Sequence, residues 1–145
     1  MPTINRHALV PFSAEQMYTL VNAVDDYAEF LPGCKKSTVL EKSEHHMRAL
    51  MLLSKAGIEK ELTTHNELVY GKSIIMRLDK GPFKSLEGIW DFTCLGDQAC
   101  RVELKLDFQF KNKITEKAFG KIFIALANSM VEAFTKRAKQ VYGKA

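Results

Sequence analysis

The side chains best suited to chemistry in this sequence are aromatic rings and thioethers that recur at alternate positions of strand-like segments. Because successive residues of a β-strand point to opposite faces, these side chains gather on one face of a sheet. Rings offer wide flat contact area and methionine adapts its shape, so the set suits a pocket for an apolar ligand. A closely packed core is the alternative, since protein interiors are normally filled. The sheet residues are Met51, Met76, Phe83, Trp90, Phe92, Phe108 and Phe110, and those facing them from a helix are Phe119, Phe123, Met130 and Phe134.

A second informative group is a set of lysines toward the C-terminus. Residues 1–110 contain 13 Lys and Arg against 15 Asp and Glu, whereas residues 111–145 contain 8 against 2. Such a basic segment favours an anionic partner, such as nucleic acid or lipid headgroups, although it can also be an ordinary hydrated helix face. The lysines that we expect to face an anionic partner are Lys113, Lys117, Lys121, Lys136 and Lys139.

Motifs of the common enzyme classes are absent from the sequence. It has no glycine-rich phosphate loop, no GxSxG nucleophile elbow and no HExxH zinc motif. His45 and His46 are adjacent and would point to opposite faces of a strand, so they do not make a metal-binding pair. The sequence therefore predicts neither a catalytic residue nor a metal site.

The cysteines are three in number and include no CxxC pair. This pattern predicts free thiols in a reducing compartment. We expect Cys34, Cys94 and Cys100 to be small buried residues. A hairpin loop at residues 96–98 would place Cys94 near Cys100 on the apolar face.

The elements that must position these residues start with a strand at residues 3–10, closed by Pro11. From residue 34 to residue 111, apolar residues recur at every second position. This alternation predicts six further antiparallel strands. Gly88, inside one of them, indicates a β-bulge or a close approach of the backbone. The expected strand cores are residues 37–42, 46–54, 58–66, 73–79, 86–95 and 99–111.

Two short helices are expected between the first strand and the others. Ser13 and Gln16 form a capping-box pattern at the start of the first helix. Asp26 and Glu29 repeat the pattern for a second helix, which ends at Pro32-Gly33. The apolar stripe of the first helix is Met17, Leu20, Val21 and Val24, and the second helix buries Tyr27, Phe30 and Leu31.

Residues 114–142 predict one long amphipathic helix. Its apolar side spans an arc of roughly 200°, so we expect it to be embedded in the fold. Arg137 falls inside this arc. Its aliphatic stem is expected to pack there while the guanidinium reaches the helix end or an acidic partner.

The whole chain has 145 residues, of which 46% are hydrophobic and 26% charged, and we expect one domain over residues 1–145. Its longest apolar run, residues 122–127, is far shorter than the roughly 20 residues that cross a bilayer. No signal- or transit-peptide pattern is present at the start. We therefore expect a cytosolic α+β protein without a transmembrane segment, in which a seven-stranded antiparallel sheet curls around the C-terminal helix in a helix-grip layout.

Several short motifs resemble the START-like coenzyme Q-binding and polyketide cyclase family. Each motif is weak alone, but their combination is specific and extends along the whole chain. They are Phe30-Leu31-Pro32-Gly33-Cys34, Gly81-Pro82-Phe83-Lys84 followed by Leu86, Gly88, Trp90 and Phe92, then Leu106-Asp107-Phe108, Ala118-Phe119-Gly120, Met130-Val131, Ala133-Phe134, Arg137-Ala138 and Val141-Tyr142-Gly143.

The resemblance implies a helix-grip fold and binding of ubiquinone or a similar isoprenoid lipid, with no other cofactor. The bacterial branch that the motifs match best implies a toxin that associates with the large ribosomal subunit, blocks subunit joining, and is paired with an antitoxin protein. The five lysines named above would then face the ribosome. No acid/base pair for a cyclase reaction is evident, so we carry over no catalytic residue. A cyclase or hydratase acting on an apolar substrate in the same cavity is the alternative.

Within this resemblance, Phe30 and Leu31 have the position of a lid end, or simply mark the end of a helix. Trp90 and Phe92 share a face and are the first candidates for ligand contact, although core packing is the alternative for Phe92. The Trp90 indole N–H can also donate a hydrogen bond to a quinone carbonyl. The complete set of expected ligand-contacting residues is Phe30, Leu31, Met51, Met76, Phe83, Trp90, Phe92, Leu104, Leu106, Phe108, Phe123 and Met130.

Overall fold

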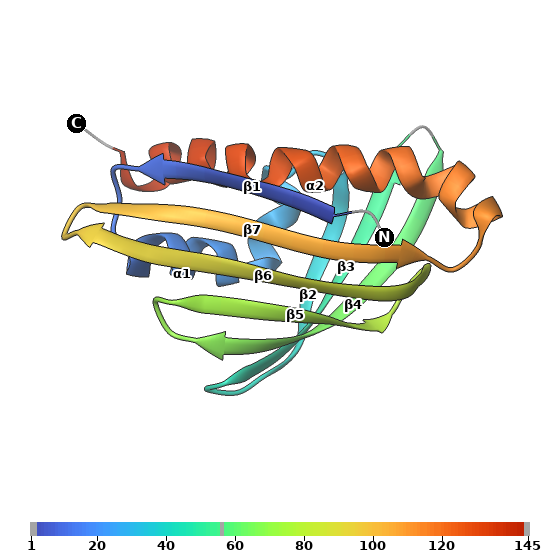
Figure 1. The fold of residues 1–145 in the computed structure, drawn as a ribbon, viewed down its shortest axis with the longest axis horizontal. Coiled ribbons are helices and arrows are strands. Elements are labelled where there is room, and N and C mark those ends of the chain that lie inside the picture. The colour runs from blue at the N-terminus through green and yellow to red at the C-terminus, as the bar shows by residue number, and fades with distance from the viewer. Residues whose placement is uncertain (1–2, 56, 144–145) are drawn as a thin grey trace.

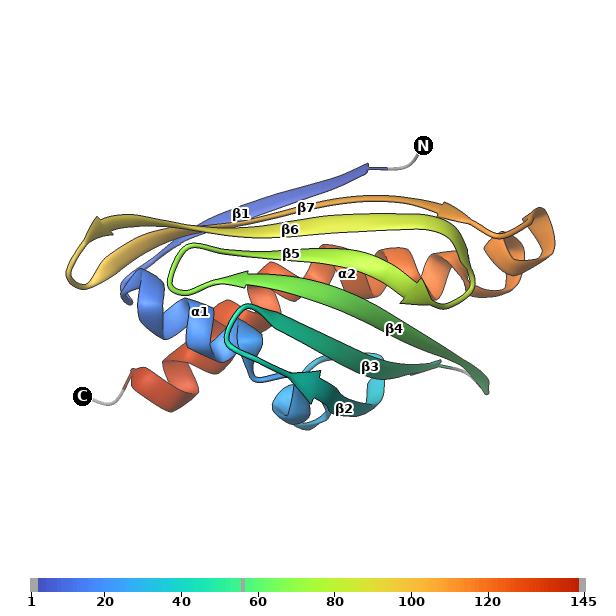
Figure 2. The same ribbon diagram turned by 90° about the horizontal axis from the view of Figure 1, so that it is seen from below.

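The computed structural model describes residues 3–55 and 57–143. Seven strands form one antiparallel sheet in the order β1-β7-β6-β5-β4-β3-β2, and helix α2 runs along it (Figure 1). Figure 2 shows that the sheet curves and that α1 and α2 lie on its inner side. The predicted α+β helix-grip architecture is confirmed. The elements are β1 (Thr3–Val10), α1 (Ala14–Asn22), η1 (Val24–Glu29), β2 (Cys34–Lys42), β3 (His46–Lys55), β4 (Ile58–Val69), β5 (Ser73–Lys80), β6 (Phe83–Gly96), β7 (Ala99–Phe110) and α2 (Lys113–Tyr142).

Strand β7 shows the clearest alternation in the sheet. Its side chains are buried at every second position from residue 100 to residue 110. β7 pairs with β1 on one side, where Ile4 is opposite Leu106, and with β6 on the other, where Trp90 is opposite Leu104. The three strands therefore share one continuous apolar inner face.

Three strands are longer than the alternation predicts. β2 begins at Cys34, β4 extends to Val69 and β6 begins at Phe83, whereas we expected residues 37, 66 and 86. Register shifts between Cys34 and Lys36 and between Phe83 and Ser85 explain the early starts of β2 and β6. A bulge breaks the period of two without ending the hydrogen-bonded ladder. The other strands agree with the expected bounds to within one residue.

Helix α1 starts with the predicted capping box. The Ser13 hydroxyl oxygen accepts a hydrogen bond from the Gln16 amide at 3.1 Å, and Gln16 Oε1 accepts one from the Ser13 amide at 2.9 Å. The helix ends at Asn22, so Val24 of the expected stripe belongs to the next element.

The second short helix differs from the prediction in type and in start. η1 is a 3-10 helix without a side-chain cap, so the expected cap at Asp26 is wrong. Val24 and Tyr27 are both buried, and their spacing of three residues aligns side chains in a 3-10 turn. Packing against the sheet therefore sets the start of η1. The predicted stop is present, because Gly33 has φ 84°, which favours glycine.

Helix α2 begins where the Asn112 side-chain oxygen accepts a hydrogen bond from the Thr115 amide at 2.8 Å. By length and composition alone, this helix is able to cross a membrane. In the fold, its apolar side packs on the inner face of the sheet, and Phe119 and Phe134 are fully buried. α2 is therefore an embedded core helix, as its wide apolar arc predicts.

The cysteines agree with the prediction in part. Cys94 and Cys100 are paired positions on β6 and β7, and all three thiols are free. Cys34 and Cys100 are buried, but Cys94 is exposed, so the expected burial of Cys94 is wrong. The tip of the β6–β7 hairpin extends past α1, which leaves residues 93–98 without a covering helix (Figure 1).

Candidate functional site

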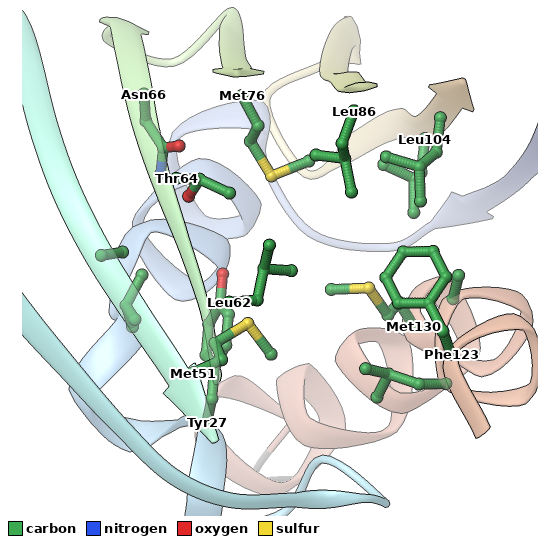
Figure 3. Close-up of a pocket in the computed structure, with 15 residues that line it drawn as sticks. Tyr27, Met51, Leu62, Thr64, Asn66, Met76, Leu86, Leu104, Phe123 and Met130 are labelled. Carbon is green, nitrogen blue, oxygen red and sulfur yellow. The ribbon is translucent and has the colours of Figure 1, made fainter. Parts of the chain in front are cut away.

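A cavity of about 60 Å³ lies between the sheet and α2 (Figure 3). Every element from η1 to α2 except β2 contributes to its walls. Pockets for drug-sized ligands usually measure about 300–1,000 Å³, so this cavity is a small opening in a mostly filled core. The lining residues are Val24, Tyr27, Ala49, Met51, Leu62, Thr64, Asn66, Met76, Leu86, Leu104, Leu106, Phe123, Leu126, Ala127 and Met130.

Half of the expected ligand-contacting residues line this cavity, and half pack elsewhere. Those in the lining are Met51, Met76, Leu104, Leu106, Phe123 and Met130; those outside it are Phe30, Leu31, Phe83, Trp90, Phe92 and Phe108.

The residues outside the lining belong mainly to aromatic clusters. The ring of Trp90 is 6.3 Å from that of Phe92 and 5.4 Å from that of Phe134, and Trp90 is only 1% exposed. Phe83 and Phe108 pack on Phe123 with centroid distances of 4.7 and 4.9 Å. These rings fill the two ends of the inner face, so the opening is confined to the middle.

The most informative lining residues that the sequence analysis missed are polar. Thr64 and Asn66 point inward from β4, between the buried residues Leu62 and Leu68. Polar residues at two successive inward positions interrupt an apolar alternation, and this interruption was the signal available in the sequence. The Asn66 side-chain oxygen Oδ1 is buried and has no hydrogen-bond partner among the described residues.

Tyr27 is the third polar residue of the lining. Its hydroxyl donates a hydrogen bond to the backbone carbonyl of Val21. Burial raises the pKa of Tyr27 far above its ordinary value, so the phenol stays neutral under physiological conditions. No Asp, Glu, His, Lys, Arg or Cys occurs among the described lining residues.

The shape of the cavity depends on Gly88 of β6, which faces inward. A Cβ atom there would lie 2.8 Å from both Met76 Cε and Leu106 Cδ1, and no register shift occurs at this position. The expected bulge at Gly88 is therefore wrong. The atoms that approach closely belong to side chains, and the nearest backbone atom, the Lys105 carbonyl oxygen, would lie 3.4 Å from such a Cβ atom. Three flexible methionines, Met51, Met76 and Met130, also border the cavity and allow its walls to adjust.

Arg137 connects the η1 side of the cavity to α2. Its guanidinium lies 3.5 Å from the Glu29 carboxylate and 5.1 Å from the centroid of the Phe30 ring. The residue thus packs its stem in the apolar arc and reaches an acidic partner, as predicted.

The five lysines of α2 are all exposed. None of them forms an ion pair with a carboxylate in the described part of the chain. Their ammonium groups are therefore available to a partner. Within residues 3–55 and 57–143, no group of three or more His, Cys, Asp or Glu is arranged to hold a metal ion.

Comparisons with known proteins agree along most of the chain. Residues 10–135 match the family described as polyketide cyclase / dehydrase and lipid transport. The ribosome association toxin RatA of Vibrio cholerae is 59% identical over 99% of this chain and 100% of its own length. The mitochondrial coenzyme Q-binding protein of Dictyostelium discoideum is 27% identical over 91% of this chain and 66% of its own.

Among solved structures, the Zhui aromatase/cyclase from a Streptomyces species has a TM-score of 0.79 and 17% identity, with 96% of this chain and 94% of that chain covered. A START superfamily protein from Mycobacterium smegmatis has a TM-score of 0.74 and 19% identity, with 96% and 98% covered. At these identities, the likeness concerns the fold alone.

Proposed function

Because the chain belongs to the polyketide cyclase / dehydrase and lipid transport family, in the branch of the RatA toxins, we propose that it is a non-enzymatic toxin that associates with the ribosome. The observation that carries this proposal is the 59% identity to a protein named ribosome association toxin, spread over 99% of the chain. The exposed lysines of α2 support it, since phosphate groups of RNA attract such a surface.

In this proposal, the α2 face contacts the large ribosomal subunit and prevents its joining with the small one. The site of action is then the bacterial cytoplasm, and an antitoxin protein would compete for the same face. Sedimentation of purified subunits through a gradient tests the proposal. We expect added protein to co-sediment with the large subunit and to reduce the fraction of joined ribosomes; unchanged joining at high protein excess would reject it.

A charge-reversal variant locates the contact. Lys121→Glu with Lys139→Glu should weaken co-sedimentation without unfolding the domain, because both side chains are exposed. The matched control is Lys60→Glu with Lys84→Glu, which changes the charge equally at exposed positions of β4 and β6. An equal reduction in both variants would indicate a non-specific charge effect and remove α2 as the contact.

A second role, binding of ubiquinone or a similar isoprenoid lipid, is favoured by the cavity between sheet and helix. The 27% identity to a coenzyme Q-binding protein also supports it. The opening of about 60 Å³ requires the methionine side chains to move when such a ligand enters. Mass spectrometry of gently purified protein should detect a co-purifying quinone. Protein that carries none and takes up none from vesicles would contradict this role.

An enzymatic role in the same cavity is the less favoured alternative. Ring closure or dehydration requires a general acid or base in contact with the substrate. The described lining offers only Tyr27, Thr64 and Asn66 as polar groups, and none of them exchanges protons readily near neutral pH. The lining therefore supports binding without catalysis.

A further inference from the structure

Two polar side chains lie on one wall of the otherwise apolar cavity. Thr64 and Asn66 are two positions apart on β4, so both point to the inner face of the sheet. Their exposed fractions are only 9% and 4%. Figure 3 shows both on the side of the cavity opposite Leu104 and Phe123.

Asn66 would cost free energy at this position if its only role were to fill the core. Its Oδ1 atom is buried without a hydrogen-bond partner among the described residues. Buried polar atoms are nearly always paired, because a buried amide without a partner loses its hydrogen bonds to water. Leucine has the same branched shape and carries no polar atom, so it would not suffer this loss. Because Asn66 also lines the cavity, a second molecule bound there can supply the missing hydrogen bond.

Tyr27 adds a third polar group from η1. Its hydrogen is donated to the Val21 carbonyl, so its oxygen remains only as an acceptor. Thr64 and the amide of Asn66 can both donate and accept. A group that accepts one hydrogen bond and donates another matches this set, whereas a carbonyl, which only accepts, leaves Asn66 Oδ1 or Tyr27 Oη without a donor.

We propose that Asn66, Thr64 and Tyr27 form a polar subsite for the hydroxyl group of an apolar ligand, so that the protein binds a phenol or quinol in preference to the same skeleton without an O–H group. The proposal rests on the ligand-binding role proposed above and specifies the chemistry of its ligand. For a quinone-type lipid, it selects the reduced form.

The test compares two probes that differ only in the hydroxyl group, para-hexylphenol and hexylbenzene. Calorimetric titration of the wild-type protein should give an affinity for the phenol about tenfold higher, the size of a typical net hydrogen bond. Asn66→Leu should abolish this preference, so that para-hexylphenol and hexylbenzene bind with equal affinity. Its melting temperature should not fall, since an unpaired polar atom is replaced by an apolar one.

Thr64→Val should reduce the preference, and Thr63→Val is the matched control. Thr63 is buried at 5% exposure on the same strand but does not line the cavity, so the preference should persist in this variant. Equal affinity of the wild-type protein for both probes overturns the subsite and leaves ligand binding intact. If neither probe binds, both the subsite and the proposed ligand-binding role are overturned. A preference that survives in folded Asn66→Leu also overturns the subsite.

Discussion

The terminal methyl carbon of Met76 lies 2.8 Å from the point where a Cβ atom would be placed on Gly88. Gly88→Ala should therefore push Met76 and Leu106 into the cavity. We expect weaker binding of para-hexylphenol and a decrease of about 1–3 kcal/mol in the free energy of unfolding, because the inner face becomes overpacked. Calorimetric titration and urea unfolding measure the two effects.

Removal of the crowded side chain provides the control. Met76→Ala combined with Gly88→Ala should restore room in the cavity and with it the affinity for the probe. Undiminished affinity in Gly88→Ala alone would mean that the ligand does not enter beside Met76.

Trp90→Phe should separate stability from ligand binding. Trp90 packs between Phe92 and Phe134 and lies outside the cavity lining. Removal of part of a fully buried ring should lower the free energy of unfolding by about 1–3 kcal/mol. The affinity for para-hexylphenol should stay the same. A large drop in affinity in the folded variant would instead place the ligand at Trp90, where the sequence analysis expected it.

The lysines of α2 should control how ribosome binding depends on salt. Binding through phosphates releases counterions, so affinity falls steeply as salt rises. The plot of log affinity against log salt has a negative slope. Removing one lysine that binds a phosphate should make this slope less steep by about one unit. Lys121→Glu should show this change in co-sedimentation at several salt concentrations. A slope equal to that of wild-type protein would show that Lys121 binds no phosphate.

The cysteines should differ in their reaction with iodoacetamide. Burial raises the pKa of Cys100 to about 11 and also raises the pKa of Cys34. A thiol reacts as its thiolate, and both buried residues are also shielded from the reagent. At about pH 8, mass spectrometry should find Cys94 alkylated well before the other two. Rapid alkylation of Cys100 would indicate that the sheet opens locally.

Asp79 on the outer face of the sheet should give a small pH-dependent contribution to stability. Arg48 donates a hydrogen bond to its carboxylate at 2.7 Å and holds the pKa of Asp79 below its ordinary value of 3.8. Because this pKa is lower in the folded state, the stabilisation is present above 3.8 and is lost as the pH falls through the folded value. Asp79→Asn should therefore be less stable than wild-type protein at neutral pH but not in strong acid.

Urea unfolding at both pH values measures this difference, which should be small because the pair is exposed to solvent. Asp97→Asn is the matched control, since Asp97 is exposed and forms no ion pair in the described chain. A pH-independent difference between Asp79→Asn and wild-type protein would contradict the prediction.

The fold was largely predictable from the sequence because its strands and its long helix have strong apolar periods. The alternation along β7 and the capping box at Ser13 each identified an element correctly. Errors arose where tertiary packing overrides local signals. η1 begins before the Asp26 pattern because Val24 must be buried, and bulges extend β2 and β6 beyond the visible alternation.

The cavity was predictable only in part. Residue types distinguish apolar from polar faces, but they do not tell which part of an apolar face is filled. Trp90 was favoured for its place on the apolar face and its hydrogen-bond donor, but its large ring packs against Phe92 and Phe134 outside the cavity. Gly88 shows the opposite case, since a residue without a side chain helps to shape the cavity through its neighbours.

Strand β1 joins the sheet through β7, the last strand in the sequence, with Thr3 opposite Asp107, 104 residues later. All the other strands lie between β1 and β7 in the sequence, so pairing these two strands closes a long loop. The loss of chain entropy on closing this loop opposes the pairing. Folding should therefore take about milliseconds to seconds, as in other proteins dominated by non-local contacts. In pulsed hydrogen exchange, the amides of β1 should be among the last to become protected.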